Sequence, residues 1–133
     1  MANTTFTGPV RSQNGFQSIT KSATTGAVTV NATYGKTTIL SAQSLSGAGA
    51  VDITNTFTSL TTTGASQALT LADGAAGQMK IITHTVDGGS AILTPTTKIG
   101  FSTITFTAVG DSVTLVYTAA GWAVVGSKGV TIA

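Results

Sequence analysis

Few side chains of this protein could carry acid–base or nucleophilic chemistry. The chain has four aspartates and one histidine, and it has neither glutamate nor cysteine. The lack of cysteine excludes disulfides, thiol catalysis and cysteine metal sites. A single histidine without glutamate leaves too few ligands for a closed zinc site. Two carboxylates that flank one bond could still hydrolyse a glycoside, so the aspartates are the first candidates for catalysis.

Three of the four aspartates, Asp73, Asp87 and Asp111, stand beside a glycine in segments with the composition of turns. Aspartate at such a position normally accepts a hydrogen bond from nearby backbone, so we expect a structural role for each. His84 lies between two threonines in a strand-like segment, and no Gly-x-Ser-x-Gly elbow accompanies it. A Ser-His-Asp triad is therefore disfavoured, and we expect His84 to be a packed or solvent-facing strand residue.

Two other motifs invite a binding function. Gly47-Ala48-Gly49 lacks the third glycine and the lysine of a phosphate-binding loop. Tyr117 and Trp122 could form a sugar-stacking platform, but we favour a place in the core of the last hairpin. The sequence thus predicts no catalytic residue, no cofactor and no metal, and the chain is not expected to be an enzyme.

The composition limits the partners of the chain. Only 8% of the residues are charged, against about 25% in an average soluble domain. Lysine and arginine are scattered singly, which predicts no nucleic-acid partner. No apolar run reaches the roughly 18 residues of a membrane-spanning helix, and the N-terminus lacks the basic and apolar parts of a signal peptide. The mean hydropathy of +0.36 favours a folded chain over a disordered one.

Apolar and polar residues alternate along much of the chain, which is typical of half-buried strands. About nine strands separated by short turns predict an all-β fold, a compact antiparallel sandwich or a jelly-roll-like barrel. Residues 42–50 are predicted to form a loop. The clearest strand-like segments are 28–34, 37–41, 51–58, 69–71, 79–86, 91–94, 103–107, 113–117 and 122–125.

Residues 1–22 differ from the rest and are predicted to be an extended N-terminal arm, with a single β-domain over 23–133. The arm carries isolated apolar residues and two turn dipeptides, so it is either a frayed terminus or a segment that docks on a neighbour. Phe6, Val10 and Phe16 share parity, which would place them on one side of an extended segment. Arg11 would lie on the opposite side, where it could meet a carboxylate. The predicted contact residues are Phe6, Pro9, Val10, Arg11 and Phe16.

The same composition favours self-association. A domain of this size buries only about two-thirds of its unfolded surface, and it has no disulfide or metal to add stability. Its surface must consist largely of threonine, serine and small apolar residues. Such a surface carries few charged groups to keep the chain in solution. We expect a homotrimer in which part of that surface is covered.

Several phrases resemble sequences of structural proteins of tailed phages. They cover roughly residues 2–16, which look like the start of virion proteins of marine and cyanobacterial phages, and 69–130. The phrases are Ala2-Asn3-Thr4-Thr5-Phe6-Thr7-Gly8-Pro9-Val10-Arg11-Ser12, Leu71-Ala72-Asp73-Gly74, Gly77-Gln78-Met79-Lys80-Ile81-Ile82, Ala91-Ile92-Leu93-Thr94-Pro95-Thr96, Ile104-Thr105-Phe106-Thr107-Ala108-Val109-Gly110-Asp111-Ser112-Val113-Thr114-Leu115 and Gly121-Trp122-Ala123-Val124-Val125-Gly126.

Similar sequences occur in capsid decoration (cement) proteins and in β-rich segments of tail fibres. The resemblance implies a trimeric all-β knob on the exterior of the phage capsid, with the major capsid protein as its partner and no membrane partner. An alternative is a tail-fibre or receptor- or glycan-binding module of the virion, and a third is a small hydrolase. A chain that is nearly all one domain favours the decoration protein, since a fibre would need a shaft.

Overall fold

A computed structural model describes residues 16–34 and 42–133, which fall into two compact units, Met1–Ile39 and Leu40–Ala133. In the first unit, β1 (Phe16–Lys21) pairs antiparallel with β2 (Val28–Tyr34) to form a two-stranded sheet. The connecting turn is closed by Ser22 N–H donating to Ala27 O at 2.8 Å. The strand predicted over 28–34 is therefore confirmed. Residues 28–34, which the sequence assigned to the β-domain, pair with β1 in the first unit.

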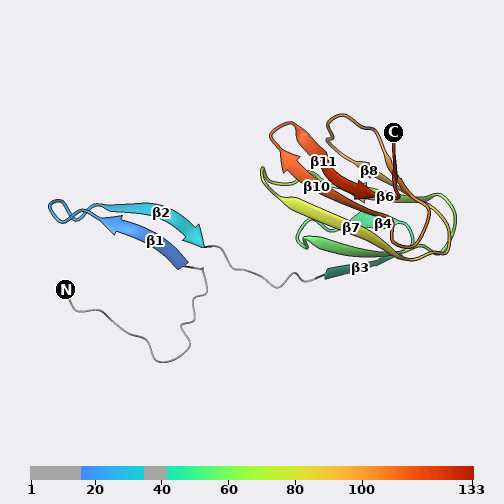
Figure 1. Ribbon diagram of the computed structural model, residues 1–133, viewed down its shortest axis with the longest axis horizontal. Helices are drawn as coiled ribbons and strands as arrows, with labels where there is room; N and C mark the ends of the chain where they lie inside the picture. The colour runs from blue at the N-terminus through green and yellow to red at the C-terminus, as the bar shows by residue number, and fades with distance from the viewer. Residues whose placement is uncertain (1–15, 35–41) are drawn as a thin grey trace, which may run out of the picture. The chain divides into compact units, whose positions relative to one another are not determined.

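The second unit is all-β, as predicted, and consists of two five-stranded sheets packed as a sandwich (Figure 1). The sandwich is not closed into a barrel. The β7 sheet has the strand order β11-β10-β7-β5-β3, and the β8 sheet has the order β12-β9-β8-β6-β4. The strands are β3 (Ala42–Ser46), β4 (Gly49–Val51), β5 (Phe57–Thr61), β6 (Gln67–Leu71), β7 (Met79–Val86), β8 (Ala91–Pro95), β9 (Ile104–Phe106), β10 (Ser112–Thr118), β11 (Gly121–Lys128) and β12 (Thr131–Ile132).

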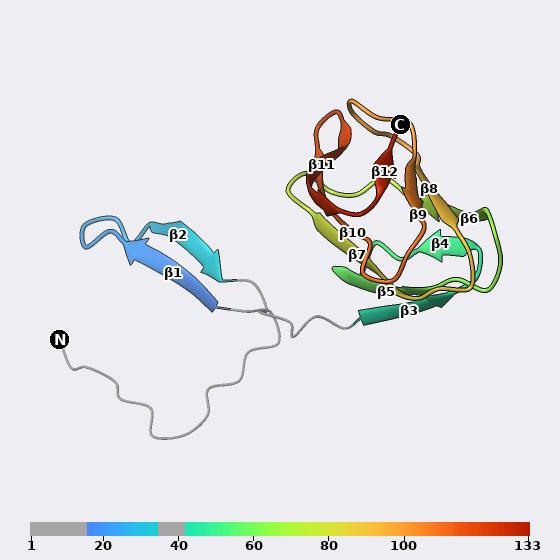
Figure 2. The same ribbon diagram turned by 45° about the vertical axis from the view of Figure 1, so that its right-hand side comes forward.

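The sheets are mixed, which corrects the prediction of an antiparallel sandwich. From β3 to β8 the chain crosses to the other sheet after every strand, so β3, β5 and β7 run parallel, as do β4, β6 and β8. From β3 to β8, the chain therefore reaches the next strand of a sheet through a strand of the other sheet. No hairpin connects neighbouring strands between β3 and β8. Every antiparallel pair of this unit contains at least one of the strands β9 to β12 (Figure 2). Alternating patterns identify strands, but they do not reveal which strands pair.

The least accurate predictions fall at the start of this unit. Residues 42–50 were expected to form a loop but contain β3 and most of β4. Residues 51–58 were expected to form one strand, but the chain bends at 53–56 and β5 begins at Phe57. Asp52 stabilises this bend, because it accepts hydrogen bonds from Thr54 N at 2.7 Å and from the Asn55 side chain at 2.6 Å. The predicted strand 37–41 lies outside the described residues.

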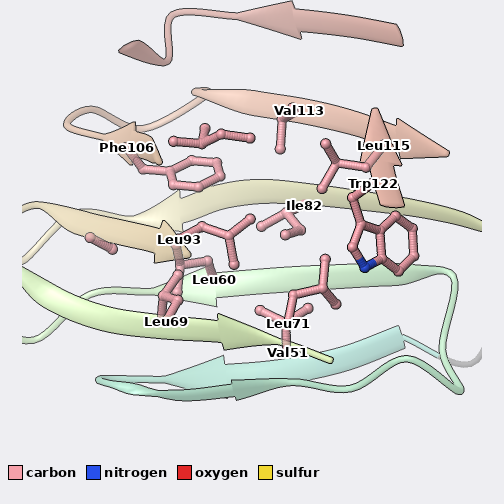
Figure 3. Close-up of a cluster of buried hydrophobic side chains, with 12 residues drawn as sticks. Val51, Leu60, Leu69, Leu71, Ile82, Leu93, Phe106, Val113, Leu115 and Trp122 are labelled. Atoms are coloured by element: carbon pink, nitrogen blue, oxygen red, sulfur yellow. The ribbon is translucent and has the colours of Figure 1, made fainter. Parts of the chain in front are cut away.

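The core lies between the two sheets and is built from the inward-pointing residues of their alternating strands (Figure 3). Phe106, Leu115 and Trp122 have no exposed surface. The strands predicted over 79–86, 103–107 and 113–117 are confirmed in position, and the last two are also confirmed in phase. The buried hydrophobic residues are Val51, Leu60, Leu69, Leu71, Ile82, Ala91, Leu93, Ile104, Phe106, Val113, Leu115 and Trp122.

Candidate interaction surface

The outer face of the β7 sheet carries a group of apolar side chains. In the observed register Phe57 stands opposite Ile81, and Met79 stands opposite Val116. Met79 is 46% exposed, and the other three residues are half-buried. Ala123 extends the group onto β11 as the partner of Val116. The strand register therefore assembles one apolar patch from four strands that are separate in sequence.

Hydroxyl side chains occupy the neighbouring row of the same face. Ser44, Ser59, Thr83 and Ser112 are successive Cα partners across β3, β5, β7 and β10. The Ser59 and Thr85 hydroxyls are 2.8 Å apart and hydrogen-bonded to each other. Partners on adjacent strands lie about 4.8 Å apart, so the row is a regular ladder of hydroxyl groups.

Charge is nearly absent from the β7 sheet. Its five strands contain only two charged residues, Lys80 and Lys128. Lys80 points inward and has no exposed surface, and Lys128 ends the edge strand β11. The outer face of the sheet is therefore uncharged as far as Lys128, with an apolar half and a hydroxyl half. Another surface can cover it without desolvating an ion.

Lys80 holds the bend between β4 and β5 from inside the sandwich. Its ammonium group donates to the backbone oxygens of Asp52 and Asn55, both at 2.6 Å. Gln78, two residues earlier, donates from its side chain to Ile53 O. Burial lowers the pKa of Lys80 to about 8, and the nearby Asp52 carboxylate only partly opposes this shift. Hydrogen bonds from Thr54, backbone first, lower the pKa of Asp52.

His84 occupies the other inward end of β7 and is also without exposed surface. Its Nε2 is 3.0 Å from the Thr62 hydroxyl, which in turn accepts a hydrogen bond from Gly88 N at 2.8 Å. Its Nδ1 is buried and has no hydrogen-bond partner within the described part of the chain. His84 was expected to be either a packed or a solvent-facing strand residue, and it is packed.

Asp111 organises the turn between β9 and β10. Its Oδ2 accepts hydrogen bonds from the N–H groups of Thr107 at 2.8 Å and Ala108 at 3.0 Å. Burial alone would raise the pKa of Asp111, but these hydrogen bonds outweigh it and hold the pKa below its ordinary value. Gly129 has a φ of +76°, and a Cβ there would lie 2.0 Å from Asp111 Oδ1. The turn, the carboxylate and this glycine therefore form one tightly packed unit.

The other aspartates also hold turns, as predicted, although not always their own. Asp87 accepts from Gly89 N at 2.8 Å, which is the expected local bond. Asp73 instead accepts from the Thr97 N–H and hydroxyl, both at 2.9 Å. Asp73 thus joins two turns that are far apart in sequence, which its flanking glycine could not indicate.

The contact residues predicted in the arm are mostly outside the described residues. Phe6, Pro9, Val10 and Arg11 belong to residues 1–15, and Phe16 is the first residue of β1, where its Cα partner is Tyr34. Their predicted role in binding a neighbour remains a prediction.

The aromatic pair proposed as an alternative sugar platform lies at the end of β10 and β11. Tyr117 and Trp122 pack edge to face with ring centroids 5.1 Å apart. Trp122 is fully buried and donates from its indole N–H to Ala72 O at 2.9 Å. Its ring therefore belongs to the core, as favoured from the sequence.

Residues 16–34 and 42–133 contain neither a pocket nor a group of three residues able to hold a metal ion. They also include no helix long and apolar enough to cross a bilayer. No protein-family model and no curated protein sequence matches the chain.

Sequence reasoning missed both Lys80 and the apolar patch on the β7 sheet. The phase of β7 could have identified Lys80, because it shares parity with the buried Ile82 and His84. The patch could not be found in this way, because it depends on parallel register between β5 and β7 and on antiparallel register between β7 and β10.

Proposed function

We propose that this protein is a non-catalytic structural protein of a phage particle, which binds the outside of the head as a homotrimer and stabilises the coat lattice. The observation that supports this proposal best is the uncharged outer face of the β7 sheet. Its apolar half, formed by Phe57, Ile81, Met79 and Val116, is the kind of surface that marks a protein–protein contact. We assign this apolar half to the contact between copies of the chain, and the resemblance to decoration proteins supplies the coat as the partner of the trimer.

The stabilisation would follow from mass action. A protein that binds the assembled coat and not its dissociated subunits shifts the equilibrium toward the assembled state by roughly 2.7 kcal/mol per site at a hundredfold excess over Kd. A trimer that contacts the coat at three places also gains avidity, since the second and third contacts form intramolecularly. Neither effect requires a pocket or a reactive side chain.

Substitution of Met79 by lysine tests the role of the face. Met79 is exposed, so Met79→Lys should change the free energy of unfolding by less than about 0.5 kcal/mol. It should weaken self-association at least about tenfold, because an ammonium group would be buried in the contact. Thr94→Lys, on the exposed side of β8, is the control of equal charge. Sedimentation equilibrium measures the association, and co-sedimentation with stripped phage heads measures attachment.

Two results would contradict the proposal. A chain that stays monomeric at every concentration and does not bind stripped heads would remove both the trimer and the head as its site. Equal binding by Met79→Lys and the unsubstituted chain would show that the β7 sheet is not the contact face.

One observation favours the second function, a tail-fibre or receptor-binding module. Strands β3 to β8 form three successive pairs, one strand in each sheet, stacked in parallel. Such stacking can be extended along one axis, as in an elongated fibre. Binding to host cells or to glycans, with no binding to heads, would identify this function.

A further inference from the structure

One end of the sandwich has two edge strands whose outer sides have no partner strand among residues 16–34 and 42–133. Strand β3 is the last strand of the β7 sheet, and β4 is the last strand of the β8 sheet. In the described residues each pairs on one side only, β3 with β5 and β4 with β6. We call β3 and β4, the first pair of the parallel stack, the open end (Figure 2).

Within the open end, the five-residue strand β3 lacks the features that usually keep sheet edges from pairing, whereas β4 has only three residues. Residues 42–51 contain no charged residue and no proline, and no bulge interrupts the pairing of β3 with β5. Proteins commonly protect edges with charge, proline, bulges or very short strands. The opposite edges of the same sheets are protected, since β11 contains a register shift and ends at Lys128, and β12 has only two residues.

The open end is also held in one conformation. The Gln43 side chain donates to Ala50 O at 2.9 Å and accepts from Asp52 N at 2.8 Å and from the Thr58 hydroxyl at 3.0 Å. Gly47 N donates to Thr61 O at 2.9 Å, which fixes the turn between β3 and β4. A partner strand would therefore meet a preformed edge and would lose little free energy in ordering it.

We propose that the open end binds the open end of a second copy of this chain, so that β3 pairs antiparallel with β3 of the partner around a two-fold axis. A two-fold axis places each residue near its own counterpart, so a charge on β3 would meet the same charge. An edge without charge satisfies this condition. Strand addition supplies main-chain hydrogen bonds, which are the groups that β3 leaves unpaired.

This contact uses the backbone edge of β3, whereas the contact of the proposed function uses the apolar half of the outer face, which carries Met79. If both contacts form, three copies joined through the β7 sheet would be paired end to end into an assembly of six. Loss of the face contact would leave end-to-end dimers, and loss of the end contact would leave trimers. The two proposals can therefore fail separately, and the measured mass shows which has failed.

A charge on the central residue of β3 tests the contact. Ser44 is exposed, and in a pairing centred on it the two side chains would lie about 5 Å apart. Ser44→Lys should weaken the two-fold association at least about tenfold, and Ser44→Glu should do the same. A mixture of the two variants should associate again, because each lysine then faces a glutamate. Thr70→Lys on β6, which has a partner strand on each side, is the matched control.

Sedimentation equilibrium of the full chain at micromolar concentration gives the masses, in multiples of 13.2 kDa, and circular dichroism checks folding. If Ser44→Lys does not fold, Ser46→Lys replaces it. The association of the unsubstituted chain should also change little with added salt, since no ion pair contributes to it. The proposal is overturned if the unsubstituted chain shows no two-fold association, if Ser44→Lys leaves the mass unchanged, or if the lysine–glutamate mixture does not reassociate.

Discussion

The inner faces of the two sheets differ in chemistry, and β7 and β8 show this most clearly. The inward residues of β8 are Ala91, Leu93 and Pro95, all apolar and buried. Those of β7 are Lys80, Ile82 and His84, equally buried but apolar only at the centre. The fully buried residues of the other strands of the β8 sheet are likewise apolar. One sheet therefore contributes burial alone, and the other adds polar anchors at both ends of its central strand.

These two polar anchors contact polar groups next to β5, which apolar residues could not satisfy. Lys80 satisfies two carbonyl oxygens of the bend that leads into β5, and His84 contacts the Thr62 hydroxyl that follows β5. Both ends of β5 are thus tied to β7, its parallel neighbour. Parallel strands that are joined by crossovers lack a hairpin turn to fix their register. The comparison suggests that buried polar contacts supply this function in the β7 sheet.

The largest expected effect lies in the apolar sheet. Phe106→Ala should reduce the free energy of unfolding by about 3–5 kcal/mol, because a fully buried ring leaves a cavity. Phe57→Ala, a half-buried ring on the outer face of the other sheet, is the control and should cost about 1 kcal/mol. Urea unfolding measures both. Equal losses would mean that the outer face contributes to the fold as much as the core does.

A smaller effect is expected at Lys80. Lys80→Met should cost about 2–3 kcal/mol at pH 7, since the oxygens of Asp52 and Asn55 lose their donor. The pKa of Lys80 is about 8 in the folded protein against 10.5 as its ordinary value, so the unfolded state holds the proton more tightly. This opposes folding below pH 8, and the opposition is relieved as the pH rises to 10.5.

The stability of the unsubstituted protein relative to Lys80→Met should therefore rise between pH 8 and pH 10.5. Urea unfolding across this range measures the slope, and Lys98→Met, at a half-buried lysine with one carbonyl partner, is the control. A constant difference between the two proteins from pH 7 to pH 10.5 would argue against a buried ammonium group at Lys80.

Most of the fold of the second unit was predictable because its strands alternate strongly. The segments that form β9 and β10 carry large apolar residues at every second position, and their position and buried phase follow directly. The segment that forms β3 and β4 consists of small residues, so its sequence resembles a loop, and only pairing with β5 and β6 makes it a strand.

The contact surfaces were less predictable than the fold. The apolar patch and the open end both depend on which strands are neighbours, and parallel crossover pairing is a property of the whole chain. Of the polar residues, the turn aspartates followed from their glycines. Asp73 was assigned to its own turn because nothing near it in sequence indicates Thr97.

The smallest of these effects concerns Asp111, an anchor outside the strands. Its carboxylate accepts from the Thr107 and Ala108 N–H groups, and these bonds hold its pKa below the ordinary value of 3.8. A carboxyl group with a lowered pKa in the folded state stabilises the protein above its unfolded pKa, and this contribution is lost as the pH falls through the folded pKa. Asp111→Asn should cost about 1–2 kcal/mol at pH 7.

The cost should shrink as the pH falls below 3.8, because the aspartate of the unsubstituted protein then becomes neutral as well. Asp87→Asn is the matched control, since Asp87 is exposed and accepts a single backbone hydrogen bond from Gly89. Urea unfolding from pH 2 to pH 7 measures both variants. A cost at Asp111 that stays constant over this range would assign it to altered packing against Gly129, whereas a cost that vanishes in acid would assign it to the charge.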